Sequence, residues 1–317
     1  KNAEIRNHTH QPCVIGTTAW GFAREDVVRQ FDYLFIDEAG QVAVANLLAM
    51  SRAASNLVLM GDQMQLGQPT QGTHPGDSGL SILDYLLHQT PTISEEKGVF
   101  LDTTYRMHSA VNQFISQAVY EGKLHTDPQN DQQTVTVPTD YQGQLAQEAG
   151  IVYLPVDHEG NTQASTEEVA LIQKTAYELL GRDFTAKDGS TRPISWDDML
   201  FVAPYNQQVG LLQSALGEQA KVGSVDKFQG QEAPIVFFSL CASNASDSPR
   251  GMEFLFDKNR INVAISRAQS LAIVVANPAL GSGGANNLDQ QQKLNLFCYL
   301  VRYAENFKKV ELLQVNL

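Results

Sequence analysis

Six short runs of consecutive apolar residues recur along the 317-residue chain. Each run ends in small, polar or charged residues, and a strand buried on both faces of a parallel sheet has this unalternated pattern. The runs lie at 13–18, 33–40, 57–62, 199–205, 235–240 and 271–278. The pattern therefore predicts two groups of three buried strands.

Helical periodicity lies between several of these runs. One helical face is formed within 109–120 by apolar residues at i, i+3, i+4, i+7 and i+8, namely Val111, Phe114, Ile115, Ala118 and Val119. A second buried stripe lies in 259–270, and there Arg260 and Arg267 project together on the flank of the expected helix, where they could face a cleft. Alternating strands and helices predict an α/β fold with parallel sheets flanked by helices.

The chain is long enough for about two domains. We place the boundary near 90–98, which gives domains 1–97 and 98–317, because 99–108 begins a new strand-like segment. The polar stretch 122–150 is rich in Gln, Asp, Thr and Pro and indicates an exposed connection or insertion. A Gly-rich loop at 281–287 precedes a closing helix.

Composition narrows the classes of protein. No stretch approaches the roughly 20 apolar residues of a membrane span, so we expect no membrane segment. The three cysteines lie far apart, so the sequence favours neither disulfides nor a zinc site and fits a protein of a reducing cytoplasm. His8, His10 and Cys13 have a clip-like spacing but no evident fourth ligand. The net charge of −13 argues against affinity for nucleic acid based on phosphate neutralisation, although a protein can also bind a few nucleotides through amides, hydroxyls and stacking.

Chemically suited residues follow the first group of runs. Asp37 and Glu38 come directly after an apolar run, where one carboxylate can hold Mg²⁺ and its neighbour can orient a water. Gln65 follows the next run and can bond a terminal phosphate or a water. A solvated strand end and a polar turn are the alternative interpretations of these two places.

A second set lies in the later half of the chain. Arg106 and Arg267 carry planar guanidinium groups suited to phosphate oxygens, with a surface ion pair as the alternative. Gly230 would allow close backbone approach and Glu232 would accept bonds from a ribose hydroxyl, unless this segment is only the turn before a strand.

Further residues at strand ends suit nucleic acid. Pro204 and Tyr205 end one run and could hold a base or backbone, although a packed tyrosine is the alternative. Thr17 and Thr18 close the first run and could bond phosphates, although threonines are also ordinary strand formers.

The order of these segments resembles that of superfamily 1 helicases. DEAG, GDQMQL, TYRMH, VAPYNQQ, SVDKFQGQE and NRINVAISRA look like motifs II, III, IV, IVa, V and VI, in the right order. The resemblance is closest to the 5′-to-3′ branch with the nonsense-mediated-decay RNA helicase and the Okazaki-fragment helicase-nuclease. Phrases such as FLDTTYRMH and SPRGMEFLFDKNRINVAISRA resemble bacterial proteins with a RecB-like nuclease ahead of the helicase.

The resemblance implies two RecA-like (P-loop NTPase) domains with ATP between them and single-stranded nucleic acid across their tops. Asp37 would then hold Mg²⁺, Glu38 would activate water and Gln65 would sense the terminal phosphate. Arg106 and Arg267 would contact that phosphate, Tyr105 would stack on adenine and Glu232 would bond the ribose. The residues along the nucleic-acid strand would be Thr17, Thr18, Pro204, Tyr205 and Ser224.

The sequence departs from the family at one motif, because nothing in it fits the phosphate-binding loop GxxxxGK[ST]. We therefore expect a fragment whose first domain is incomplete, with that loop and any nuclease upstream in the same polypeptide. The favoured function is an ATP-dependent 5′-to-3′ helicase or translocase, on DNA rather than RNA because the resembling proteins are fused to a nuclease. The alternatives are a non-catalytic helicase-fold scaffold and a nucleotide-dependent switch.

Overall fold

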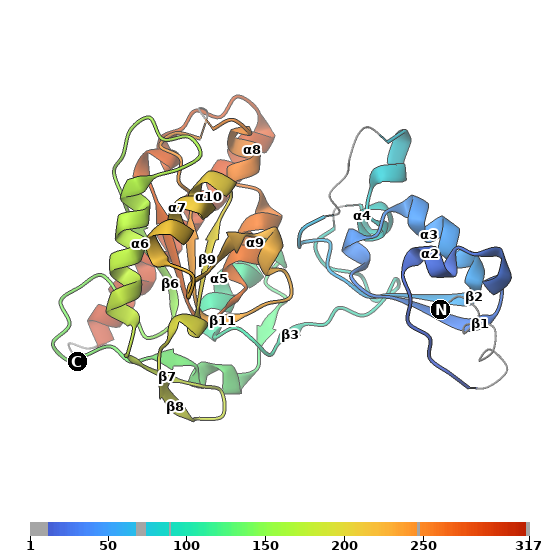
Figure 1. The fold of residues 1–317 in the computed structure, drawn as a ribbon, viewed down its shortest axis with the longest axis horizontal. Helices are drawn as coiled ribbons and strands as arrows, with labels where there is room; N and C mark the ends of the chain where they lie inside the picture. Colours follow the sequence, from blue (N-terminus) through green and yellow to red (C-terminus); the bar gives the residue numbers. More distant parts are fainter. Residues whose placement is uncertain (1–11, 68–73, 89, 246–247, 315–317) are drawn as a thin grey trace. The chain divides into compact units, whose positions relative to one another are not determined.

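The computed structural model describes residues 12–67, 74–88, 90–245 and 248–314. The chain divides into two compact units, Lys1–Gly98 (unit 1) and Val99–Leu317 (unit 2), which Figure 1 draws in blue and in green to red. Both units are α/β structures in which parallel strands pack against helices, so the predicted fold class is confirmed.

Unit 1 is built on two parallel strands. β1 (Phe31–Ile36) pairs with β2 (Ala54–Leu59), and Leu34 lies opposite Leu57. The unit's helices are α2 (Ala19–Phe22), α3 (Val44–Met50) and α4 (Ile82–Leu87). Apolar residues of α3 and α4 cover Leu34 and Ile36 and so form a small core.

The other face of this two-stranded sheet is open. Tyr33 and Phe35 are 58% and 62% exposed, so the prediction that these strands are buried on both faces is wrong for unit 1. The physical reason is that the helices cover only the face that carries Leu34 and Ile36. Residues 13–18 are not a strand either, since they form an irregular segment in which Val14 is fully exposed.

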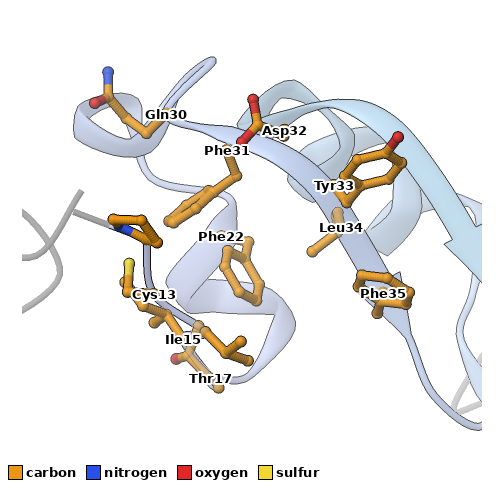
Figure 2. A pocket seen from close by; sticks show the side chains of 13 residues that line it. Cys13, Ile15, Thr17, Phe22, Gln30, Phe31, Asp32, Tyr33, Leu34 and Phe35 are labelled. Carbon is orange, nitrogen blue, oxygen red and sulfur yellow. The ribbon is translucent and has the colours of Figure 1, made fainter. Parts of the chain in front are cut away.

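A pocket of about 910 Å³ lies between this irregular segment and β1. Figure 2 shows the side chains of Cys13, Ile15, Phe22 and Phe31 gathered around it. Thr17 also lines it, whereas Asp37, Glu38 and Gln65 do not. The pocket is therefore separate from the predicted chemistry of unit 1.

Unit 2 is organised around a five-stranded parallel sheet. Its strand order is β10 (Lys221–Ser224), β9 (Met199–Ala203), β11 (Ala233–Ser239), β12 (Ala268–Ala276) and β6 (Gly150–Pro155). β9 and β11 are buried along their whole length, and β12 nearly so, which confirms three predicted strands. The edge strands β6 and β10 were not predicted.

Helices cover both faces of this sheet (Figure 1). α6 (Thr166–Leu179) and α7 (Asn206–Leu216) pack on one face around the stacked rings of Phe201 and Phe237, whose centroids are 4.9 Å apart. α5 (Ser109–Val119), α9 (Lys258–Ile265) and α10 (Leu288–Gln314) pack on the other. The predicted apolar face of α5 is confirmed, since Val111, Phe114, Ile115 and Val119 are buried.

Short strands flank this sheet. β3 (Thr103–Thr104) pairs with β4 (His125–Thr126), and β5 (Thr134–Val135), β7 (Asp183–Thr185) and β8 (Thr191–Pro193) form an antiparallel sheet. The strand expected from 99 onwards is limited to β3, because Val99 and Leu101 are 82% and 83% exposed.

The segment 122–150 also differs from its prediction. It was expected to be exposed, yet Asn130, Val135 and Leu145 are buried. Val135 and Leu145 join the core of unit 2, and the Asn130 amide donates hydrogen bonds to the carbonyls of Thr104 and Met107. Most of the segment's other polar residues are exposed, and the buried Asn130 amide nitrogen is satisfied by these backbone carbonyls.

Among the helices of the described residues, none is both long enough and apolar enough to cross a membrane.

Candidate functional site

The loop after β1 presents Asp37 and Glu38 to solvent. The backbone N–H of Glu38 donates to Asp37 Oδ1 at 3.0 Å, and Glu38 has φ of 51°. A non-glycine residue in this left-handed region is strained, and such strain is kept only where the surroundings hold it. Here the following residue, Ala39, is held by its N–H bond to the carbonyl of Met60 at 2.8 Å.

The loop after β2 orients Gln65. Gln65 Nε2 donates to Asp62 Oδ2 at 3.0 Å, and Asp62 Oδ1 accepts the N–H of Met64 at 2.9 Å. Asp62 is therefore the residue that positions the Gln65 amide.

Two glycines allow these loops to lie against each other. A Cβ at Gly40 would be 2.6 Å from the carbonyl oxygen of Asp62, and one at Gly61 would be 2.7 Å from the nitrogen of Ala39. Side chains at either place would force the backbones apart. The glycines of DEAG and GDQMQL therefore bring the acidic pair and Gln65 to the same end of the β1–β2 sheet.

The carboxylates of this end suit Mg²⁺ as a partial ligand set. Asp37 and Glu38 are exposed and aim oxygen ligands at solvent. Within the described parts of the chain, no three His, Cys, Asp or Glu residues are grouped to hold a metal. Mg²⁺ is commonly held by one or two carboxylates together with water and substrate phosphates, so the residues present fit that use.

In unit 2 a polar cluster forms at the amino ends of β11 and β12. Arg106 Nε donates to Glu232 Oε2 at 2.5 Å, and Arg106 Nη1 donates to the carbonyl of Ser266 at 3.2 Å. Gln269 Nε2 donates to Glu232 Oε1 at 2.9 Å. Burial alone would raise the pKa of Glu232, but the bonds from Arg106 and Gln269 outweigh it and hold this pKa below its usual value.

The aromatic residue beside this cluster is open to solvent. Tyr105 is 68% exposed, and Lys187 Nζ lies 5.1 Å from its ring centroid. An exposed ring, a part-exposed guanidinium and a carboxylate at one edge are the kinds of group that hold a base, a phosphate and a ribose. The residues present therefore fit a nucleotide.

Arg267 occupies a different position from the one predicted. Its side chain is 2% exposed, with Nε bonded to the carbonyl of Val263 at 3.2 Å and Nη1 to that of Gln231 at 3.3 Å. It does not project with Arg260 from one helix, because α9 ends at Ile265 and Arg260 instead pairs with Asp226 at 3.4 Å. Arg267 in this conformation holds the 231–232 segment against α9.

Gly230 lies in the turn before β11. Within the chain, no atom lies within 4 Å of the place that its Cβ would take, so packing does not require glycine there. Its φ of 77° does require glycine, because the left-handed region of backbone conformation favours a residue without Cβ. Gly230 therefore shapes the turn that ends at Glu232.

The predicted nucleic-acid residues of unit 2 lie at the opposite, carboxyl edge of the sheet. Pro204 and Tyr205 follow β9, and Ser224 ends β10 opposite Ala203. Pro204 and Ser224 are partly exposed, but Tyr205 is 6% exposed, with its ring 5.3 Å from that of Phe254 and its hydroxyl bonded to Ser248. Tyr205 is thus the packed tyrosine of the alternative interpretation, and its ring is closed to a base.

Thr17 and Thr18 are exposed in the irregular segment before α2. Thr18 precedes the first residue of that helix, without a side-chain capping bond. Their hydroxyls are accessible, although no strand positions them.

A buried polar network at the carboxyl edge escaped the sequence analysis. Glu168 in α6 is fully buried and accepts hydrogen bonds from Ser239 Oγ at 2.5 Å and from the Cys241 N–H at 3.0 Å. His158 Nε2 lies 3.1 Å from its other oxygen. Burial, followed by the charge of Glu168, raises the pKa of the Cys241 thiol. The signal in the sequence was the position of Glu168 at the start of the apolar stripe of Val169, Ile172, Ala176 and Leu179.

Comparison with known families agrees with this arrangement. One AAA-domain family model matches residues 79–279 and a second AAA-domain model matches residues 1–71. The chain therefore belongs to the AAA-domain family.

Three relatives show which kinds of protein the chain is similar to. The chain is 27% identical to the DNA polymerase alpha-associated DNA helicase A of Schizosaccharomyces pombe over 78% of its own length and 37% of the relative. It is 28% identical to DNA-binding protein SMUBP-2 of Mesocricetus auratus over 77% of its own length and 25% of that relative. It is 27% identical to the Regulator of nonsense transcripts 1 homolog of Drosophila melanogaster over 78% of its own length and 21% of that relative.

The chain thus spans between about a fifth and two fifths of these relatives. They confirm the predicted resemblance to superfamily 1 helicases of the nonsense-mediated-decay and Okazaki branch. Closeness to nuclease fusions stays a prediction. Among solved structures, an Arterivirus nonstructural protein 10 (helicase) in complex with DNA aligns with a TM-score of 0.40 and 15% identity over 77% of this chain and 39% of that one.

Proposed function

We propose that this chain is part of an ATP-dependent helicase or translocase that moves 5′-to-3′ on single-stranded nucleic acid, with DNA as the first candidate. Residues 1–97 would be the later part of one RecA-like domain and 98–317 the second. The observation that carries the proposal is the cluster of Arg106, Glu232 and Gln269 beside the open ring of Tyr105, formed from segments far apart in sequence.

Bound ATP would supply a terminal phosphoryl group for transfer to water, and Mg²⁺ would neutralise its charge. In unit 1, Asp37 supplies the carboxylate that holds Mg²⁺. Glu38 takes the proton of the attacking water, and Gln65, oriented by Asp62, reports the presence of the terminal phosphate.

In unit 2, Tyr105 stacks on the adenine and Glu232 accepts a ribose hydroxyl. Arg106 turns from Glu232 to a phosphate oxygen, since one guanidinium can exchange a carboxylate for a phosphate with little change in geometry. Arg267 stays a predicted phosphate contact, and it reaches that position only by leaving the carbonyls of Val263 and Gln231. Gly230 holds the turn that presents Glu232.

Thr17 and Thr18 of unit 1 and Pro204 and Ser224 of unit 2 would each contact the strand, and the buried Tyr205 packs against Phe254 beside Pro204. Relatives whose names include a DNA helicase and a DNA-binding protein support DNA, and a regulator of nonsense transcripts keeps RNA as the second candidate. A nuclease domain in the same polypeptide, a role in DNA repair and a cytoplasmic location belong to the same proposal.

The sequence contains no GxxxxGK[ST] loop. That loop supplies the amides and lysine that cradle phosphates in this class of enzyme. We therefore propose that residues 1–317 alone turn over ATP poorly and that the full-length protein is the active species.

The test is the ATPase rate of the full-length protein with oligothymidine, oligouridine or no nucleic acid. We expect one oligonucleotide to stimulate turnover, and Glu38→Gln to lower kcat by at least about 100-fold because the proton acceptor is lost. Glu218→Gln, at an exposed position before β10, is the matched control and keeps the wild-type rate. A wild-type protein that stays silent with every nucleic acid would favour the non-catalytic scaffold.

A further inference from the structure

An arginine–aromatic cluster lies on α8 (Gly251–Leu255) and the start of α9. The guanidinium carbon of Arg250 lies 3.7 Å from the ring centroid of Phe254, and that of Arg260 lies 4.3 Å from the same centroid. The ring is 9% exposed. One buried phenylalanine ring therefore makes cation–π contacts with two arginines.

The cluster lies at the carboxyl edge of the central sheet. Phe254 packs against Tyr205, which directly follows β9, and the ring centroids are 5.3 Å apart. Arg260 pairs with Asp226, two residues after Ser224 at the end of β10. The two arginines are thus attached to the same edge that carries Pro204 and Ser224.

The two arginines differ in availability. Arg260 has a side chain only 19% exposed and is neutralised by Asp226. Arg250 is exposed, and within the residues that the structure describes no carboxylate pairs with it. Stacking restrains its guanidinium plane, so an incoming anion would pay little of the side-chain entropy that ordering a free arginine costs.

We propose that Arg250 is a backbone phosphate contact for the single strand, held in place by Phe254. This inference rests on the proposed function and names a binding residue of its nucleic-acid surface. It explains how a chain of net charge −13 binds a polyanion, because the charge that matters is the local positive charge at the strand edge.

The test measures binding of labelled oligothymidine and oligouridine to the full-length protein by fluorescence anisotropy across a range of salt concentrations. Each phosphate neutralised on a single strand adds about 0.7 to the slope of log K against log salt. We expect Arg250→Gln to weaken binding by about 3- to 10-fold at low salt and to lower that slope by about 0.7, alike for different base sequences. The KM for ATP stays unchanged, since the nucleotide cluster lies at the other edge of the sheet.

Two further variants separate charge from packing. Arg250→Lys keeps the charge and retains most of the slope, whereas Arg302→Gln, an exposed arginine of α10, keeps both affinity and slope. An Arg250→Gln protein with the wild-type slope would overturn the inference while leaving the helicase proposal intact. A wild-type protein that binds neither oligonucleotide would overturn both.

Discussion

At the scale of single residues, His108 links protonation to the start of α5. Its Nδ1 accepts the backbone N–H of Ala110 at 3.0 Å, which is possible only when that nitrogen carries no proton. Burial lowers the pKa of His108 from 6.5, and Asp131, 3.8 Å away, opposes this shift without reversing it. The folded protein therefore favours neutral His108.

This linkage has a defined sign. The unfolded chain binds the proton more readily than the folded protein. The contribution of neutral His108 to the free energy of unfolding is therefore fully present above about pH 6.5 and is lost as the pH falls through the lowered pKa of the folded state. We expect His108→Asn, which keeps a capping side chain but does not titrate, to flatten the free energy of unfolding against pH below 6.5. Chemical denaturation at several pH values measures this, and parallel curves for the two proteins would contradict it.

At the scale of elements, α7 contains a position that weakens its helix. Gly210 is exposed in the helix interior, and no atom lies within 4 Å of the place of its missing Cβ. Glycine there costs helix stability through backbone entropy. Gly217, which ends the same helix, has φ of 86°, and a Cβ there would meet the Gln219 amide at 2.6 Å.

The two glycines of α7 therefore predict opposite effects. Gly210→Ala should raise the free energy of unfolding by about 0.5–1 kcal/mol. Gly217→Ala should lower it, because alanine is strained at positive φ and is crowded there. Urea denaturation of both variants checks the pair, and a shift of the same sign in both would refute the explanation.

At the scale of the whole molecule, the two units differ in how much core they build. Unit 2 packs helices on both faces of a five-stranded sheet, whereas unit 1 leaves one face of a two-stranded sheet open. Unit 1 therefore has the smaller sheet and buries only one of its faces, so it should be the less stable unit.

Calorimetry of the chain should then show two transitions. Ile36→Ala should lower the free energy of unfolding of unit 1 by about 2–5 kcal/mol, the cost of an emptied core site, and so shift the first transition to lower temperature. Phe237→Ala should lower the free energy of unfolding of unit 2 by about 3–5 kcal/mol and so shift the second transition. Each variant is the control for the other. A single transition that both substitutions shift equally would show that the units unfold together.

The sequence alone determined the features that depend on local pattern. The runs at β9, β11 and β12 predicted central strands because both of their faces are buried, and the order of the motifs indicated the family. The edge strands β6 and β10 were missed for different reasons. β10 (KVGS) is short and has one large apolar residue, whereas β6 (GIVYLP) is an apolar run that was overlooked beside the polar stretch 122–150. Polar strand-end residues indicated where chemistry is expected at the sheet edges, and their roles stay predictions.

Only the tertiary structure decided which of those residues are available. Arg106 meets Glu232 across 126 positions of sequence, and no local pattern specifies that pair. Arg267 is buried on backbone carbonyls and Tyr205 is sealed by Phe254, because neighbours from distant segments cover them. Exposure and pairing depend on what packs around a side chain, whereas a motif specifies only the side chain and its place along the strand.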